Sequence, residues 1–340
     1  MDDALLRLLV DPQSGGPLTL ASGTLEEGLL SSIDGATHPI HVGIPRFTNV
    51  TTTDQRRTEE TFAFKWARRE AYASAGAKRL LTDWLVAKYG FADRNAMRDH
   101  FSGMRILDAG CGAGFSSSAW LDEQWHGVWV GVDISTAVDV AWERLGGFAD
   151  THFVQADLLA LPFAPETFDA IFSEGVLHHT PSTEQALGAL VPLLRLGGEI
   201  LFYVYRRKAP MREFTDDHVR ALVSKLPPNE AWEALRPVTE LGRALAALQV
   251  EVDVPEVPVL GIAAGRYDVQ RLIYWNFAKL FWNDDLSFEE NLHVNFDWYH
   301  PRYAHRQTED EVRSWCGDLG LEIVHFDVQE SGLTVRAVRS

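Results

Sequence analysis

The sequence predicts an α/β protein built on a doubly wound parallel sheet. Three apolar segments of the buried-strand type each lead into an acidic residue, at Asp108, Asp133 and Asp157. Segments with helical patterns lie along the chain beside them, and strands that alternate with helices indicate a parallel sheet. Glycines at alternate positions follow the first of these strands, which is typical of a turn that brings the backbone close to a ligand.

The glycine-rich turn has the sequence Arg-Ile-Leu-Asp-Ala-Gly-Cys-Gly-Ala-Gly-Phe-Ser over residues 105–116. Gly110, Gly112 and Gly114 leave room for a ligand, and we expect a helix from Phe115 whose first amides face that ligand. The dinucleotide-binding fingerprint has Gly or Ala where Phe115 stands, so this turn departs from that pattern. A glycine-rich turn that binds nothing is the alternative.

Acidic residues at the ends of the next two strands are candidates for cofactor binding. Asp133 ends the apolar segment 127–132. A carboxylate at this place can accept hydrogen bonds from both hydroxyls of a ribose, in a nicotinamide enzyme as well as in other nucleotide-binding proteins. Asp157 ends the segment 152–156, where a role as a helix or turn cap is the alternative.

A fourth apolar segment, Phe168–Ser173, leads into a loop with the sequence Glu-Gly-Val-Leu-His-His-Thr-Pro over residues 174–181. In doubly wound sheets the ligand crevice lies at the carboxyl ends of the strands, so we expect this loop to border the site. Two adjacent residues at the start of a helix cannot both face the crevice. One of His178 and His179 is therefore expected to be structural, and the sequence does not decide which. A fifth strand is expected at Glu199–Tyr205.

Taken together, these motifs resemble those of the class I S-adenosylmethionine-dependent methyltransferases. The specific resemblance covers residues 105–205, and the pattern of a closing helix and strand pair extends it to 308–339. It implies a seven-stranded Rossmann-like sheet and S-adenosylmethionine as the cofactor, with the adenine near Asp157. The cofactor-binding residues that the resemblance implies are Asp108, Gly110, Gly112, Gly114, Asp133, Ile134, Asp157, Leu158, Glu174 and Trp66.

Residues 1–50 are expected to form a small ribbon-like unit. The segment 38–45 resembles the ending of the zinc-ribbon-type domains that accompany many methyltransferases. The positions of the four cysteines of such domains carry other residues, Asp11, Ser14, Ser31 and Asp34. Structural zinc needs thiolate or imidazole ligands, so we predict no metal here. The alternative is a site that uses His38 and His41. We expect the unit to be an interaction surface, with homodimerisation as one role.

The remainder of the chain divides into four predicted parts. Residues 51–103 are expected to form a helical lid and scaffold segment. Related methyltransferases carry a similar aromatic-Lys-Trp segment that closes over the cofactor, so the resemblance implies Phe64 and Trp66 as lid residues; a stripe that faces the core is the alternative. Residues 104–205 are the cofactor-binding core. Residues 206–307 are a mainly helical insertion that caps the substrate, and 308–340 supply the closing helix and strand pair. The specific function is expected in the insertion, because such inserts vary within one fold.

The candidate acceptor site combines the loop 174–180 with the segment 297–306 of the insertion. The candidate catalytic residues are His178, His179, Tyr299 and His300. The candidate substrate-binding residues are His178, Tyr299, Arg302 and Tyr303. A histidine could deprotonate a hydroxyl acceptor, whereas sulfur and unprotonated amines need no base. Arg302 or Arg306 could pair with a carboxylate of the substrate. The counter-interpretation is that most aromatic residues of the insertion pack its own core.

Composition narrows the class of protein. The formal net charge is -17, and no run rich in Lys or Arg stands out, which disfavours nucleic acid as a partner. Two cysteines cannot form a disulfide framework. No apolar run approaches the roughly 20 residues that span a bilayer, and the N-terminal residues lack the positive charge of a secretory signal. These features predict a cytoplasmic protein without a membrane partner.

The predicted function is methyl transfer from S-adenosylmethionine to a small-molecule acceptor. Length, acidity and layout resemble those of bacterial methyltransferases of dimethylsulfoniopropionate synthesis. The specific hypothesis is therefore S-methylation of a small thioether acid such as 4-methylthio-2-hydroxybutyrate. The alternatives are O- or N-methylation of another metabolite, an RNA or protein methyltransferase, a nicotinamide oxidoreductase and a non-catalytic cofactor-binding module.

Overall fold

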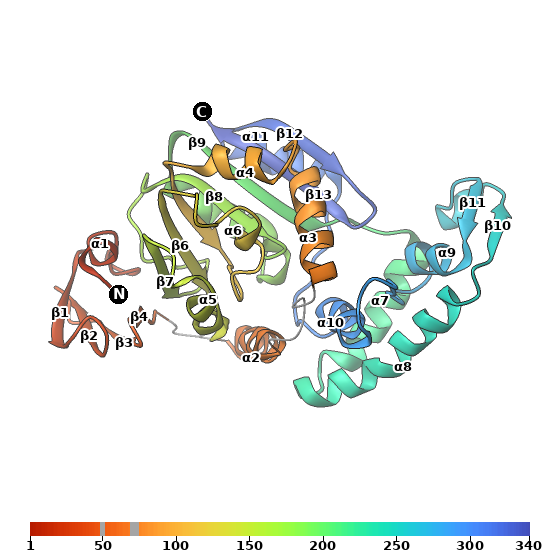
Figure 1. Cartoon of the computed structure of the whole chain (residues 1–340), viewed down its shortest axis with the longest axis horizontal. Helices are drawn as coiled ribbons and strands as arrows, with labels where there is room; N and C mark the ends of the chain where they lie inside the picture. Colours follow the sequence, from red (N-terminus) through yellow and green to blue (C-terminus); the bar gives the residue numbers. More distant parts are fainter. Residues whose placement is uncertain (48–51, 69–74) are drawn as a thin grey trace.

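The computed structural model describes residues 1–47, 52–68 and 75–340 (Figure 1). Its centre is a sheet of seven strands. These strands are β5 (Arg105–Ala109), β6 (Val128–Asp133), β7 (Thr151–Gln155), β8 (Phe168–Glu174), β9 (Leu194–Tyr205), β12 (Leu321–Val328) and β13 (Gly332–Arg339). They lie in the order β12-β13-β9-β8-β5-β6-β7. The strands β5 to β9 are parallel, and β13 pairs antiparallel with both β9 and β12. The predicted doubly wound seven-stranded sheet is confirmed.

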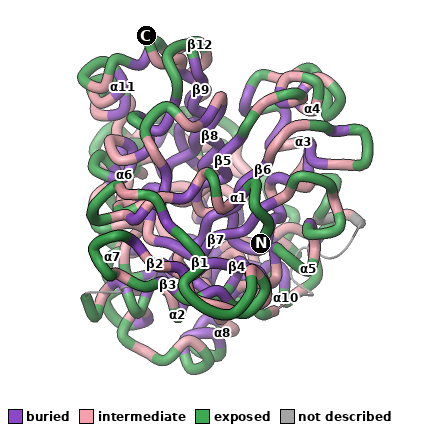
Figure 2. Tube along the Cα trace, turned by 90° about the vertical axis from the view of Figure 1, so that its left-hand side faces the viewer, coloured by how far each residue is buried: buried purple, intermediate pink, exposed green. Residues whose placement is uncertain are grey.

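The order of the strands fixes the place of the crevice. β5 lies between β6 and β8, so the chain winds to one edge of the sheet and then returns to build the other half. In such sheets the ligand binds at the carboxyl ends of the strands where the winding reverses. Ile106 and Leu107 of β5 are fully buried, and Figure 2 shows the central strands as buried segments inside exposed loops.

Helices lie beside the sheet, as the alternation of strands and helices predicts, although α4 was not predicted. The covering helices are α3 (Ala75–Lys88), α4 (Arg94–Phe101), α5 (Ala137–Leu145), α6 (Thr183–Leu190) and α11 (Glu309–Asp318). The expected helix after the glycine turn is only the short 3₁₀ turn η1 (Ser117–Ala119). Serines here bond locally instead: the Ser118 hydroxyl donates to the Phe115 carbonyl at 2.6 Å. Such bonds compete with a regular helix.

The N-terminal unit is an antiparallel sheet of four strands that packs against the core at β7. Its elements are α1 (Asp3–Leu6), β1 (Leu18–Gly23), β2 (Gly28–Ser32), β3 (Thr37–His41) and β4 (Ile44–Pro45). The Arg46 guanidinium donates to Asp139 at 2.5 Å and to Gln155 at 2.9 Å. These bonds join the N-terminal unit to the core, and the unit lies beside β7 and α5 in Figure 1. The predicted boundary between residues 50 and 51 lies outside the described residues.

Asp11 and Ser14, two of the positions that carry cysteines in zinc-ribbon-type domains, form a hydrogen-bonded turn. One oxygen of Asp11 accepts from the Ser14 amide at 2.8 Å, and the other bonds His38 Nε2 at 2.9 Å. Both Asp11 and His38 are buried. Among the residues that the structure describes, no three His, Cys, Asp or Glu side chains are grouped to hold a metal ion. His41 instead bonds Glu27 at the surface, at 3.0 Å.

The helix α2 (Thr53–Ala67) lies at the edge of the sheet where the parallel strands have their carboxyl ends. Thr52 caps it by accepting from the Gln55 amide at 3.1 Å. Thr58 and Thr61 lie on its buried face, where their hydroxyls donate to the carbonyls one turn earlier at 3.0 and 2.7 Å. Buried hydroxyls must find such partners, and the backbone of the same helix supplies them.

The insertion lies at the opposite end of the core from the N-terminal unit (Figure 1). Its elements are α7 (Pro210–Val223), α8 (Pro228–Ala246), β10 (Glu251–Val254), β11 (Gly265–Asp268), α9 (Val269–Asn276) and α10 (Phe288–Tyr299). The aromatic-rich stretch 267–282 is not a single helix. The helix α9 ends within it, at Asn276. The amide of Phe281 then donates to the Asn295 side chain at 2.9 Å, so tertiary bonds replace the helical ones. Within the described ranges no helix is long and apolar enough to cross a membrane.

Candidate active site

A cavity of about 710 Å³ opens at the carboxyl ends of β5, β6 and β8. Three parts of the chain line it: the helix α2, the loops of the core, and the insertion with α9 and α10. Pockets that enclose drug-sized ligands measure about 300–1,000 Å³. The cavity is therefore large enough for a nucleoside-sized cofactor with a small acceptor beside it.

The glycine turn forms one wall of this cavity, with Gly110 and Gly112 in the lining. Gly110 has a φ of 86°, and a Cβ on it would collide with the side chain of Val176. A Cβ on Gly112 would lie 2.8 Å from Nε1 of Trp66 in α2. Larger residues would therefore push the turn away from the loop after β8 and from the lid helix. Gly114 does not line the cavity, because it faces Leu145 of α5.

Asp108 is buried and does not line the cavity, which corrects the expected cofactor contact. It accepts a hydrogen bond of 2.6 Å from the Ser117 hydroxyl, which in turn accepts from Trp129 Nε1 at 3.1 Å. Burial raises the pKa of Asp108 to about 7, although the bond from Ser117 opposes that shift. Asp108 therefore holds the glycine turn in place from the side away from the ligand space.

Asp133, at the end of β6, lies in the cavity wall next to Ile134. One carboxylate oxygen accepts from the Gly112 amide at 2.9 Å. The other accepts from the amide and hydroxyl of Ser135 at 2.8 and 2.7 Å. Burial raises the pKa of this carboxyl, and the three donors oppose the shift. Each carboxylate oxygen has more than one lone-pair site, so the group retains capacity to accept from a ligand.

Asp157 and Leu158 line the cavity after β7. The Asp157 carboxylate accepts from Gln55 Nε2 of α2 at 2.6 Å and from the Leu159 amide at 3.0 Å. Sequence reasoning missed Gln55, because nothing in a helix 102 positions away marks it as the partner of a strand-end acid. The helix α2 thus lines the cavity along much of its length, from Gln55 to Trp66.

Glu174, at the end of β8, is held by two side chains of the region around α3. Lys88 Nζ forms an ion pair with one oxygen, and the Tyr89 hydroxyl donates to the other at 2.8 Å. The Lys88 side chain is fully buried; burial lowers its pKa to about 8, and Glu174 opposes that shift. We expected α3 to be scaffold alone, so its contact with the site was also missed. An apolar helical pattern gives no sign that its last lysine points inward.

The structure distinguishes the two adjacent histidines. His178 is fully buried, lies outside the cavity lining, and its ring centroid is 3.7 Å from that of Tyr205. His179 lines the cavity, and its Nδ1 is 2.7 Å from the Tyr303 carbonyl oxygen. A carbonyl only accepts, so Nδ1 carries the proton and Nε2 the lone pair. Burial lowers the pKa of His179 to about 4, so its imidazole is neutral at pH 7.

An ionic cluster connects the lid helix to the insertion. Lys65 Nζ of α2 lies 2.5 Å from one oxygen of Asp297 in α10, and the Tyr205 hydroxyl donates to the other at 3.0 Å. Burial alone would raise the pKa of Asp297, but Lys65 and the other cations nearby hold it well below its usual range. All three side chains line the cavity. Asp297 belongs to the segment 297–306 that was predicted to face the acceptor, whereas Lys65 and Tyr205 were not predicted as site residues.

Three predicted acceptor residues lie outside the cavity lining, whereas Asp297 and Tyr303 of the expected segment 297–306 line it. Tyr299 is buried, and its hydroxyl donates to Asp216 at 3.1 Å. His300 is buried between Thr61, at 3.0 Å, and the Leu226 carbonyl, at 3.1 Å. The expected acceptor contacts of Tyr299 and His300 are therefore corrected: protein groups satisfy both side chains.

Arg302 is the third of these residues. Its guanidinium forms an ion pair of 3.1 Å with Asp54 at the start of α2, and it does not line the cavity. Arg306 is also paired, with Glu213 at 2.8 Å and with Asp217. Both arginines lie beside carboxylates of their own chain, so neither is placed to take a substrate carboxylate.

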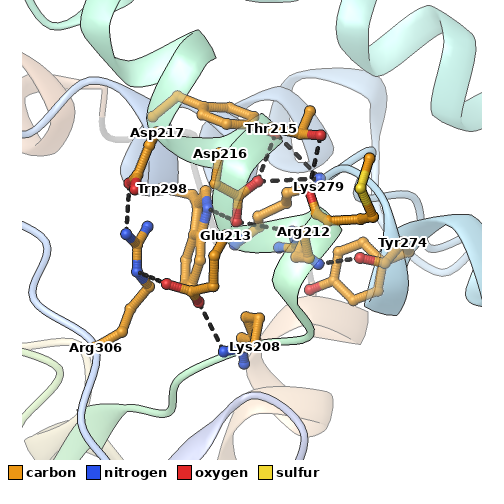
Figure 3. Close-up of polar contacts among 12 residues, drawn as sticks. Lys208, Arg212, Glu213, Thr215, Asp216, Asp217, Tyr274, Lys279, Trp298 and Arg306 are labelled. Carbon is orange, nitrogen blue, oxygen red and sulfur yellow. Dashed lines mark hydrogen bonds and ion pairs between the residues drawn. The ribbon is translucent and has the colours of Figure 1, made fainter. Parts of the chain in front are cut away.

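A buried network around Asp216 of α7 supports the insertion (Figure 3). Its carboxylate accepts from Arg212 Nε at 2.7 Å and from Trp298 Nε1 at 2.8 Å. The Tyr299 hydroxyl completes the network by accepting from the Lys279 amide at 3.0 Å. These bonds fasten α7, α10 and the segment after α9 to one another. They therefore fix the wall of the cavity from which Lys279 projects.

The sheet order and the cavity define a class of protein: a doubly wound α/β domain with a glycine-rich cofactor cradle at its switch point. Comparison with known proteins identifies the family. Residues 107–202 match the family described as "Methyltransferase domain". This part of the chain is a class I S-adenosylmethionine-dependent methyltransferase domain, and S-adenosylmethionine is its cofactor. The cradle of Gly110 and Gly112 and the carboxylate of Asp133 fit such a group.

Curated proteins are similar to parts of this chain. Malonyl-[acyl-carrier protein] O-methyltransferase of Enterobacter lignolyticus is 35% identical over 29% of the chain, and the chain spans 38% of its length. Phthiotriol/phenolphthiotriol dimycocerosates methyltransferase of Mycobacterium leprae is 26% identical over 54% of the chain and 68% of its own length. The chain thus covers less than two fifths of the length of the Enterobacter protein.

Among solved structures, magnesium protoporphyrin IX methyltransferase of Synechocystis PCC 6803 with bound S-adenosylhomocysteine is 17% identical to the chain. The superposition covers 84% of this chain and 100% of the other, with a TM-score of 0.44. A likeness this loose does not bear on the substrate.

Proposed function

We propose that this protein transfers the methyl group of S-adenosylmethionine to a small-molecule acceptor. One observation carries the proposal: a single cavity is lined both by the cofactor residues of the core, such as Gly110 and Asp133, and by residues of the insertion, such as Tyr274 and Lys279. A donor on the core side and an acceptor on the insertion side would then share one space. Holding two reactants in line in such a space is the main contribution of a protein to a displacement of this kind.

We further propose that the acceptor is a small thioether acid such as 4-methylthio-2-hydroxybutyrate. S-adenosylmethionine supplies a methyl group that is already activated on a sulfonium. The thioether sulfur forms the new bond with its own lone pair, so no protein base has to remove a proton. Aromatic side chains that line the cavity, such as Trp84, Tyr203 and Tyr205, can stabilise the cationic product by cation–π contact.

A second candidate, O-methylation, is favoured by His179. Its imidazole lines the cavity in the neutral form, with the lone pair on Nε2. Nε2 is buried and has no hydrogen-bond partner within the described chain. A hydroxyl acceptor would lose its proton to this atom as the new carbon–oxygen bond forms. The Enterobacter relative named above is itself called an O-methyltransferase.

Calorimetry and a transfer assay test the proposal. We expect one S-adenosylhomocysteine site per chain and no heat from NAD. We also expect methyl transfer from labelled S-adenosylmethionine to 4-methylthio-2-hydroxybutyrate without release of a proton. Binding of NAD in place of S-adenosylhomocysteine would contradict the methyltransferase proposal. Transfer to hydroxy acids that lack a thioether, abolished in His179→Gln, would favour O-methylation instead.

A further inference from the structure

The acidic side chains inside the cavity already have partners. Glu174 is paired with Lys88, and Asp297 with Lys65. Asp133 and Asp157 accept from amide, hydroxyl and side-chain amide donors, as described above. The remaining acid of the lining, Glu330, is exposed. Among the described residues that line the cavity, each buried or half-buried carboxylate therefore already has a hydrogen-bond or ion-pair partner.

The two cationic side chains that the insertion contributes to the cavity lining, Lys279 and Arg271, lack carboxylate partners among the described residues. Lys279 is only 6% exposed and lines the cavity, yet among residues 1–47, 52–68 and 75–340 no carboxylate oxygen lies within 4.0 Å of its Nζ. Its Nζ lies over the ring of Trp298, 4.4 Å from the ring centroid. Arg271 of α9 also lines the cavity, and its guanidinium donates only to the Trp282 carbonyl, at 3.4 Å, in the described part of the chain.

A buried ammonium without a counter-charge is unfavourable, and proteins rarely keep one unless it has a use. Carboxylates outnumber Lys plus Arg by 48 to 31 in this chain, so acidic partners are not scarce. The neighbouring Arg212 does have one, in Asp216 at 2.7 Å. Burial lowers the pKa of Lys279 to about 7, and the charge of Arg212 adds to that shift. An anion in the cavity would supply the charge that Lys279 lacks.

We propose that Lys279 and Arg271 form an anion subsite that binds the carboxylate of the acceptor. This inference rests on the proposed function and specifies its substrate class as small organic acids. Both cations come from the insertion, whereas Gly110, Asp133 and Asp157 come from the core. The negative charge is therefore assigned to the acceptor and not to the cofactor. Lys279 and Arg271 take the role that the sequence had suggested for Arg302 or Arg306.

The position of the subsite fits an acid with an apolar tail. Tyr274 and Trp275 line the cavity next to Arg271 on α9, and Phe281 lines it two residues after Lys279. Arg271 and Trp275 are one helical turn apart, so they lie on the same face of α9. A carboxylate held by the two cations would leave the rest of the molecule against these aromatic rings.

The test is calorimetry on the full chain loaded with S-adenosylhomocysteine. The probes are acetate, butyrate and 4-methylthio-2-hydroxybutyrate, each compared with its neutral amide. We expect at least one acid to bind the wild type about ten- to hundredfold more tightly than its amide, as a charge-assisted contact would give. Lys279→Met should abolish that preference and leave the affinity for S-adenosylhomocysteine unchanged. Lys225→Met, at an exposed lysine of the insertion, is the matched control and should keep the preference.

Several results would overturn the inference. One is a wild type that binds S-adenosylhomocysteine but prefers no acid over its amide. Another is a Lys279→Met protein that keeps the preference, or that loses cofactor affinity instead, because the cation would then face the cofactor. If Lys279→Met does not fold, Lys279→Arg should retain the preference and Arg271→Gln should reduce it; the opposite pattern would refute the subsite. A wild type that fails to bind S-adenosylhomocysteine at all would contradict the proposed function itself.

Discussion

Replacing Lys279 by Met should stabilise the protein in the absence of ligand. The pKa of Lys279 falls from its usual 10.5 to about 7 because burial disfavours the charged form and Arg212 repels it, while Asp297 and Asp216 oppose the shift. Lys65 of α2 also repels it. At about 1.4 kcal/mol per pKa unit, the protonated side chain costs the folded state roughly 4–5 kcal/mol at pH 7.

Part of this cost is offset. The ammonium lies 4.4 Å from the Trp298 ring centroid, and a desolvated cation–π contact of this kind contributes up to about 2 kcal/mol. Met is similar in length to Lys and apolar, so it removes the charge without a large cavity. We therefore expect the free energy of unfolding to rise by about 2–3 kcal/mol at pH 7 in Lys279→Met.

The stability difference between Lys279→Met and wild type should depend on pH, because Lys279 loses its proton at a lower pH in the folded than in the unfolded chain. Between pH 7 and pH 10.5 the unfolded chain holds a proton on Lys279 that the folded chain has lost. Wild-type stability therefore gains from this residue as pH rises through that window, and the advantage of the variant shrinks. Denaturant unfolding of both proteins at pH 7 and pH 10 measures the difference. The exposed control Lys225→Met should stay within about 0.5 kcal/mol of wild type. A less stable Lys279→Met, or a difference that does not vary with pH, would refute the argument.

Three further predictions concern the cofactor site, the candidate base and the N-terminal unit. Asp133→Ala should raise the dissociation constant for S-adenosylhomocysteine at least about tenfold through loss of charge-assisted bonds, with the exposed Asp253→Ala as control; an equal constant would make Asp133 a strand-end residue only. His179→Gln should slow transfer to a hydroxyl acceptor by about 10²–10⁴-fold and spare a thioether. Because the pKa of His179 is about 4, the wild-type rate should not fall between pH 8 and pH 6 through its protonation, and a fall that the variant lacks would contradict this. Asp11→Ala should lower stability by about 1–3 kcal/mol through loss of the Ser14 and His38 bonds, while elemental analysis of wild type should find no stoichiometric zinc; a zinc-bound protein would overturn the second expectation.

Local patterns in the sequence were enough to predict the sheet and where its crevice lies. The first four predicted strands are short apolar runs that lead into an acidic residue, and these signals depend only on neighbouring residues. The carboxyl ends of parallel strands meet at one edge of a sheet, so Asp133 and Asp157 could be assigned to one crevice without coordinates. The capping box at Thr308 and Glu311 likewise marked the start of α11.

The tertiary structure decided which polar side chains face the cavity. His178 and His179 are adjacent and chemically identical, and only the 3₁₀ turn η2 (Leu177–His179) and the packing of Tyr205 separate their surroundings. Asp108 stands in a motif like the other two acids, but the Ser117 hydroxyl holds it away from the ligand space.

What the sequence could not determine is the pairing of charges across the insertion. The residues around Arg302 and Arg306 in the sequence do not indicate which carboxylates will pair with them. In the structure Arg302 pairs with Asp54, and Arg306 pairs with Glu213 and Asp217. Nor does the sequence show that Lys279 will lie without a carboxylate. The physical reason is that a charge interacts with whatever the fold brings within a few ångströms, and these partners lie far apart along the chain. The strand pattern therefore predicts the cofactor edge of the site, whereas only the packed insertion decides which cations remain for the acceptor.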